Sequence, residues 1–158
     1  MKSCTLQTTL TIILAGATAA LTLLIRIPIP AAGGYLNIGD MAVIFCGLFL
    51  GKYRGACAAG VGSAIADLLG GFFIFAPITL IAKGTEAFIA GALGKNNPYW
   101  LILAGSLMVG CYFIAIIFLP GMGFSAAISA LPFDIIQGII GSIGGFFIYK
   151  SVVAALPK

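Results

Sequence analysis

Histidine is absent from the 158-residue sequence, and charged side chains of both signs are scarce. Charged residues make up 8% of the chain, eight basic and four acidic, whereas a soluble domain carries about 25%. So few charges cannot coat a water-soluble domain or form a nucleic-acid surface, which excludes a nucleic-acid partner. Without histidine, Ser/His and Cys/His catalysis, histidine relays and most zinc sites are also excluded.

The residues that are present favour an integral membrane protein. Hydrophobic residues make up 61% of the chain, and the mean hydropathy is +1.19. A transmembrane helix uses about 20 residues, so this length allows about six spans with short connections. The four cysteines show no CxxC spacing, and we expect neither a disulfide framework nor a metal site. The first apolar run has no cleavable signal sequence after it and is expected to remain as a span.

Apolar runs separated by Gly, Pro or charge predict six helices. Their ranges are 9–26, 38–51, 55–70, 77–94, 99–119 and 131–150. The predicted fold is therefore all-α, a six-helix membrane bundle in which residues 1–158 form one transmembrane substrate-binding domain. The stretch 28–35 contains two prolines and two glycines and is predicted to be a loop.

The distribution of basic residues predicts how the bundle is oriented. Six crossings put both termini on one side, and six of the eight basic residues fall on that side. These six are Lys2, Lys52, Arg54, Lys95, Lys150 and Lys158. The positive-inside rule therefore predicts cytoplasmic N- and C-termini. The helix 55–70, with small residues four apart on more than one face, is expected inside the bundle, and the short helix 38–51 is expected to lean on protein.

Charged groups within the apolar runs are the first candidates for a site. Each costs about 2.5–3.5 kcal/mol on insertion scales, so it normally faces a cavity or a partner. Lys83 and Glu86 are three residues apart, hence on one helix face, with Glu86 near the membrane midplane. Asp67 is within reach of Lys83, and this pair is either a structural ion pair between two helices or part of a site.

Other polar residues gather toward the outer half of the membrane. Asp134 and Gln137 are also three apart, and capping of a helix start after Pro132 would explain Asp134 but not Gln137. Asn37 and Asp40 end the Gly-rich loop, where Asp40 alternatively caps the next helix. The rings of Tyr35 and Tyr112 would offer stacking surfaces, or belong to the interfacial belt. Because the inner half is nearly all apolar, we expect a one-sided pocket and not a channel.

Five segments together resemble the S-components, the small substrate-binding subunits of energy-coupling-factor (ECF) vitamin transporters. The first four match in order and spacing: GYLNIGD at 34–40, GKYRG at 51–55, GSAIADLLG at 62–70 and FAPITLIAKG at 75–84. The fifth, PFDIIQG at 132–138, resembles the family's Pro-x-Asn-x-x-Gln segment with Asp134 in place of Asn. The closest pattern is the branch for hydroxymethylpyrimidine, pyridoxine or riboflavin-like substrates.

The resemblance implies a subunit that binds a vitamin on the outer face, with the loop after the first helix as a lid. It implies partners as well: a transmembrane coupling subunit and two ATPase subunits in the bacterial cytoplasmic membrane, where the partners use the ATP. Small alanines on the first helix form the family's docking face, which corresponds here to Ala15 and Ala19; the alternative is internal packing, and Gly16 and Ala20 make a second small pair. The chain itself needs no cofactor, and no phosphate-binding loop is present.

The leading hypothesis is a non-enzymatic binding subunit for a small heteroaromatic vitamin or precursor. Hydroxymethylpyrimidine and pyridoxine are favoured, with riboflavin as a further candidate. The expected ligand contacts are Tyr35, Asn37, Lys83, Glu86, Tyr112, Asp134 and Gln137. One alternative is a membrane-embedded transferase or hydrolase, weakened by the lack of histidine. Another is a homo-oligomeric, proton-coupled exporter that uses Glu86.

Overall fold

The computed structural model describes residues 4–29 and 34–156, and most of them are helical. The helices are α1 (Cys4–Leu24), α2 (Asp40–Leu50), α3 (Lys52–Gly70), α4 (Ala76–Ile89) with a π-helical turn η2 (Ala90–Gly94), α5 (Trp100–Phe118) and α6 (Phe124–Ala155). Two short strands, β1 (Arg26–Ile29) and β2 (Gly34–Asn37), lie between α1 and α2. The sequence therefore located the helical segments correctly, with shifted ends.

The prediction of an all-α chain was wrong between residues 26 and 37. Strands β1 and β2 pair antiparallel, with Arg26 opposite Asn37 and Pro28 opposite Tyr35. A proline is tolerated here because a two-stranded hairpin has only edge strands, whose outer side needs no N–H donor. The loop predicted at 28–35 thus begins and ends in strands, and its residues 30–33 lie outside the described part.

The last helix also departs from its predicted range of 131–150. Helix α6 begins at Phe124 and continues through Pro132, which lies inside it. The predicted start at residue 131 lies next to this proline, which lacks a backbone donor and commonly marks the first turn of a helix. In membrane helices a proline is tolerated when neighbouring groups satisfy the freed carbonyl, so the helix need not begin there.

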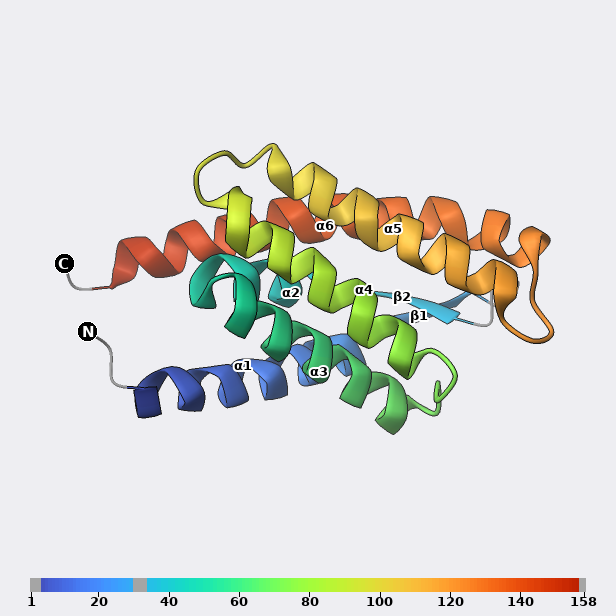
Figure 1. Cartoon of the computed structure of the whole chain (residues 1–158), viewed down its shortest axis with the longest axis horizontal. Coiled ribbons are helices and arrows are strands. Elements are labelled where there is room, and N and C mark those ends of the chain that lie inside the picture. The colour runs from blue at the N-terminus through green and yellow to red at the C-terminus, as the bar shows by residue number, and fades with distance from the viewer. Residues whose placement is uncertain (1–3, 30–33, 157–158) are drawn as a thin grey trace.

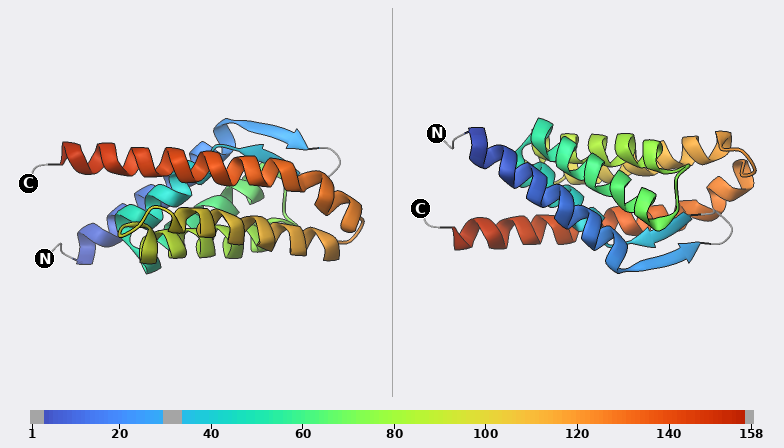
Figure 2. Two further views of the ribbon diagram at one scale, coloured as in Figure 1. Left: turned by 90° about the horizontal axis from the view of Figure 1, so that it is seen from above. Right: turned by 90° about the horizontal axis from the view of Figure 1, so that it is seen from below.

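The elements form a bundle with two distinct ends (Figure 1). Helix α1 begins and α6 ends at one end, together with the α2–α3 junction and the α4–α5 connection. The hairpin and the α3–α4 and α5–α6 turns lie at the other end, as Figures 1 and 2 show. We call this the hairpin end. Which end faces the cytoplasm stays a prediction, and two of the residues it used, Lys2 and Lys158, lie outside the described ranges.

The small residues of helix α3 face its neighbours, but its opposite face is exposed at Val61, Ile65 and Leu69, so the prediction that this helix lies inside the bundle was only partly right. It packs against α1, α2 and α4. A side chain at Gly62 would collide with the Ala15 carbonyl of α1, and one at Gly60 would meet the Leu80 carbonyl of α4. Gly51, with φ +84°, reverses the chain between α2 and α3 in a single residue, a conformation that glycine adopts most readily.

Four of the described helices are long and apolar enough to cross a membrane: α1, α4 extended by η2, α5 and α6. Helix α2 has 11 residues, which at 1.5 Å per residue cover only about half of a ~30 Å hydrocarbon core. Most of α2 is buried, so it rests against other helices as predicted. Four of the six predicted helices therefore meet this criterion within the described residues, and α2 is short, as predicted.

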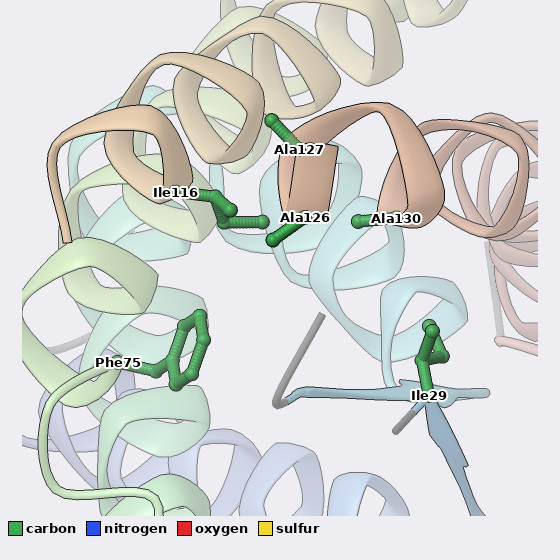
Figure 3. Close-up of a cluster of buried hydrophobic side chains, with 6 residues drawn as sticks. All are labelled: Ile29, Phe75, Ile116, Ala126, Ala127 and Ala130. Atoms are coloured by element: carbon green, nitrogen blue, oxygen red, sulfur yellow. The ribbon is translucent and has the colours of Figure 1, made fainter. Parts of the chain in front are cut away.

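A cluster of apolar side chains closes the hairpin end. It joins β1, the start of α4, the end of α5 and the start of α6 through Ile29, Phe75, Ile116, Ala126, Ala127 and Ala130 (Figure 3). The alanines let α6 approach closely, while Phe75 and Ile29 reach inward from opposite sides. This cluster holds the hairpin against the helices and forms one wall of the cavity described next.

Candidate functional site

A polar cavity lies at the hairpin end of the bundle and shares Ile29, Phe75, Ile116 and Ala130 with the cluster of Figure 3. Side chains from α1, α3, α4, α5 and α6 line it, together with side chains from both strands. Six of the seven predicted ligand contacts are among them: Tyr35, Asn37, Lys83, Tyr112, Asp134 and Gln137. Residues far apart in the sequence therefore converge on one polar site.

The seventh predicted contact, Glu86, does not line the cavity. It is fully buried, one turn deeper on α4 than Lys83. Four further polar residues line the cavity that were not among the predicted ligand contacts: Thr22, Ser63, Asp67 and Thr79. Asp67 carries a usable signal, a carboxylate within an apolar helix, but it was predicted as the partner of Lys83 and not as a ligand contact.

Lys83 is the central cation of the site. Its side chain is 3% exposed, and its ammonium forms an ion pair with Asp40 of α2 and a second one, at 3.4 Å, with Glu86. The ammonium also lies 5.5 Å from the centre of the Tyr112 ring. Two buried carboxylates thus share a single buried ammonium.

The predicted Asp67–Lys83 ion pair was wrong. Lys83 pairs instead with Asp40, for which the sequence favoured no partner and offered a helix cap as the alternative role. Asp40 makes no capping bond; α2 begins with Gly39 in the N-cap position and no side-chain cap. Gly141 of α6 explains the change, because a Cβ there would collide with Asp40, and the missing side chain lets the start of α2 sink into the bundle.

Asp67 is bonded to the hairpin and not to Lys83. The Tyr35 hydroxyl donates a hydrogen bond to Asp67 Oδ1 at 2.5 Å. The Tyr35 ring packs against Phe72, with centroids 4.6 Å apart, and the Arg26 guanidinium lies 5.4 Å from its centre. Burial and the neighbouring Asp67 carboxylate raise the pKa of Tyr35 well above its usual range. The hydroxyl therefore stays protonated and acts as a donor at physiological pH.

Gln137 connects three elements at the base of the cavity. Its Oε1 accepts a hydrogen bond from the backbone N–H of Asn37 in β2 at 2.8 Å, and its Nε2 donates to Asp40 Oδ2 at 3.2 Å. Asn37 Oδ1 in turn accepts from the Gly39 N–H at 2.7 Å. Since both polar atoms of the Gln137 amide are engaged, this residue fixes the hairpin to α2 and α6.

The cavity carries an excess of hydrogen-bond acceptors. Asp134 lines it and forms no hydrogen bond or close ion pair with any residue that the structure describes. Asp67 Oδ2 and Thr22 Oγ1 are buried and likewise lack a partner within the described ranges. Capping no longer explains Asp134, because α6 begins ten residues earlier, at Phe124. A molecule with N–H or O–H donors would satisfy these oxygens.

The cavity is contracted. Its volume is about 50 Å³, far below the roughly 300–1,000 Å³ of typical small-molecule sites. A heteroaromatic ring enters only if the lining moves, and the hairpin is the wall held by few bonds. The contacts that must loosen are those of Tyr35 with Asp67 and of Asn37 with Gln137.

The first helix presents a different face from the one that we assigned to docking. Ala19 is buried, and Ala15 packs against a core cluster that includes Val43 and Ala58. Gly16 and Ala20 lie on the exposed side, and a Cβ at Gly16 would meet nothing within 4 Å. Ala15 and Ala19 therefore serve internal packing, and the second small pair remains free.

Comparisons with known proteins agree on one family. The model of the ECF-type riboflavin transporter S component matches residues 2–154. An uncharacterized protein from a gap 3' region of Pyrococcus woesei is 38% identical over 135 residues, which span 82% of this chain and 89% of that protein. The thiamine precursor transporter HmpT of Lactococcus lactis subsp. cremoris MG1363 is 32% identical over 138 residues, 85% of this chain and 80% of HmpT.

A solved structure shares the fold. It is the S component of a bacterial ECF transporter, with a TM-score of 0.79 and 22% identity, and the match covers 99% of this chain and 100% of that one. The family is one of membrane-embedded transporter subunits and not of enzymes. This chain therefore belongs to the S components of ECF-type transporters, multi-pass membrane proteins that bind a transported vitamin.

Proposed function

We propose that this S component binds a hydroxymethylpyrimidine-type thiamine precursor in the cavity at the hairpin end. The observation that carries the proposal is the excess of acceptors there, with the carboxylates of Asp67 and Asp134 facing the cavity. An aminopyrimidine with a hydroxymethyl group offers both N–H and O–H donors to such oxygens. The similarity to HmpT supports the same ligand.

The charges of the site also argue against an anionic ligand. Lys83 already has two carboxylate partners, Asp40 and Glu86, so its charge is compensated within the protein. A phosphate or carboxylate would lie beside Asp67 and Asp134, and Lys83, the one cation among the residues that line the cavity, is already paired. Neutral or cationic rings are therefore favoured, and pyridoxine and riboflavin are the competitors to be tested.

Each predicted contact has a specific role in this proposal. Asp134 and Asp67 accept hydrogen bonds from the ligand, and the rings of Tyr35 and Tyr112 form its walls. Asn37 and Gln137 hold the hairpin over the site. Glu86 acts indirectly, by sharing the charge of Lys83.

The remaining parts of the proposal concern assembly. The chain lies in the cytoplasmic membrane of a bacterial cell with both termini inside, and it docks on a transmembrane coupling subunit served by two ATPases. Docking uses Gly16 and Ala20, because these small residues leave the exposed face of α1 open to a close helix contact.

Titration calorimetry on the detergent-solubilised protein tests the ligand. We expect hydroxymethylpyrimidine to bind more tightly than pyridoxine or riboflavin. Asp134→Asn should weaken binding about ten- to hundredfold, since a hydrogen bond to a charged group contributes about 1.5–3 kcal/mol. Ser129→Ala is the matched control, because its hydroxyl bonds only the Ser125 carbonyl of the same helix and does not line the cavity.

Three results would contradict the proposal in different ways. Tighter binding of riboflavin or pyridoxine would refute the choice of ligand and leave the site standing. Equal loss of affinity in Asp134→Asn and Ser129→Ala would remove Asp134 from the site. Absence of binding for all three vitamins by a folded protein would refute the proposed function itself.

A further inference from the structure

A second concave surface lies between α5 and α6, apart from the vitamin cavity. It is a groove of about 630 Å³, and it shares no lining residue with that cavity. Ile102 lines it from α5, and Ile135, Ile139 and Ile143 line it from α6. These isoleucines are between 44% and 65% exposed, so they form the raised rims of an open groove.

Small residues explain why the groove is deep. At Gly105, an added Cβ would lie 3.4 Å from the Gly138 carbonyl, so the two helices touch backbone to backbone. The Ser142 hydroxyl donates to the Leu101 carbonyl at 3.1 Å and is therefore already satisfied. The floor thus lacks bulky side chains, while the rims are branched and apolar.

One end of the groove is basic and aromatic. On α6 the stripe of Ile135, Ile139 and Ile143 continues at helical spacing to Phe147 and Lys150, so these residues share a face. Lys150 is exposed, with its ammonium 5.4 Å from the centre of the Phe146 ring.

The α5 side of this end is also basic and aromatic. Tyr99 and Trp100, at the start of α5, are 76% and 43% exposed, and the exposed Lys95 precedes them. The chain has four acidic residues, Asp40, Asp67, Glu86 and Asp134, and none lies in these segments. The two lysines therefore have no acidic neighbour in sequence on either helix end.

The length of the groove fits half of a bilayer. Its α6 side runs from Ile135 to Ile143, about 12 Å at 1.5 Å per residue. One leaflet contributes about 15 Å of hydrocarbon, half of a ~30 Å core. Lys150 lies seven residues beyond Ile143, roughly 10 Å further along the helix, where a phospholipid headgroup would lie.

We propose that the α5–α6 groove binds one acyl chain of an anionic phospholipid, whose phosphate lies near Lys150 and Lys95. Lysine stems extend along apolar surface and keep the ammonium at the headgroup level, where Trp and Tyr also gather. A transmembrane helix of another protein crosses both leaflets, whereas the length of this groove covers about one. An acyl chain, which lies within one leaflet, is the occupant that fits this length.

Native mass spectrometry of the full chain tests the site. The protein is titrated with phosphatidylglycerol and with phosphatidylcholine of the same acyl chains. Wild type should bind one phosphatidylglycerol preferentially. Lys150→Gln should reduce that preference about fivefold, the equivalent of about 1 kcal/mol for one lysine near an anionic surface, and Lys150→Arg should preserve it.

A substitution that fills the groove provides a second test. Ser106 is exposed and lines the groove, so Ser106→Phe should abolish bound lipid of both kinds. Leu107→Phe adds an exposed ring on the same helix outside the groove and should change nothing.

The possible results distinguish an anionic lipid from other occupants of the groove. Equal binding of the two lipids by wild type, or unchanged binding in Ser106→Phe, would overturn the proposal. So would a dimer that Ser106→Phe dissociates, since the groove would then hold a second copy. If Ser106→Phe does not fold, the comparison of Lys150→Gln with Lys150→Arg decides alone, because Lys150 is exposed.

Discussion

Replacing Lys83 with methionine is the perturbation that tests the buried charge cluster most directly. The change keeps the length and apolar stem of the side chain but leaves Asp40 and Glu86 buried without their cation. Breaking a buried pair by removing one partner costs about 3–5 kcal/mol. Lys83→Met should therefore raise the unfolded fraction about a hundred- to several-thousandfold.

The structure also predicts how much stability is lost when Glu86 or Asp40 is replaced. Glu86 Oε1 has no hydrogen-bond partner among the described residues, and Glu86 lies farther from the ammonium than Asp40. Glu86→Gln removes the surplus carboxylate and leaves the Lys83–Asp40 pair intact, so it should change the free energy of unfolding by less than about 1 kcal/mol. Asp40→Asn should fall between the two, since Glu86 can still neutralise Lys83.

Chemical unfolding in mixed detergent micelles measures these differences. Lys95→Met is the matched control, because this lysine is exposed and the same atoms are changed; we expect an effect within about 0.5 kcal/mol. The triple change Lys83→Met, Asp40→Asn, Glu86→Gln should recover most of the loss. If Lys83→Met is no worse than Lys95→Met, the reasoning from buried charge fails.

Three further predictions concern the hairpin and the first helix. The pKa of Tyr35 is raised in the fold, so its neutral form stabilises the protein fully below the unfolded pKa of about 10 and less above it. A Tyr35→Phe variant should therefore lose less stability than wild type when thermal unfolding is followed from about pH 8 to pH 11. Equal pH profiles of the two proteins would contradict this. Gln137→Ala should cost about 1–3 kcal/mol and speed amide hydrogen exchange at Asn37, and unchanged exchange would show that the amide does not hold the hairpin. Gly16→Trp should abolish vitamin uptake while binding persists, whereas Ala19→Trp should destabilise the fold; loss of binding in Gly16→Trp would contradict the docking face.

The sequence predicted six of the ten polar residues that line the cavity, and one physical reason explains why. In an apolar chain each polar group within a helix is costly, so such residues mark the interior site without knowledge of the fold. Asp134 and Gln137 were found in this way. The hairpin and the start of α6 were missed because Pro28 and Pro132 were interpreted as breaks, while the actual strand pairing and helix tolerate both.

Pairings between helices could not be predicted from one sequence, because they depend on rotation about each helix axis. Ala15 and Gly16 differ by one position, about 100° around the helix, and only the packed structure decides which of them faces Gly62. The partner of Lys83 was decided in the same way. Asp40 reaches it because Gly141, about a hundred residues away in sequence, carries no side chain.

The double engagement of the Gln137 amide has a consequence for opening of the site. The same side chain holds the Asn37 N–H of the hairpin and the Asp40 carboxylate that neutralises Lys83. The two hydrogen bonds are therefore coupled. A change that weakens the bond from Gln137 to Asp40 also changes how often the hairpin opens, and opening of the hairpin changes the electrostatic environment of the Lys83 ammonium. A substitution at Asp40, the first residue of α2 and outside both strands, would therefore change the fraction of molecules in which the hairpin is open.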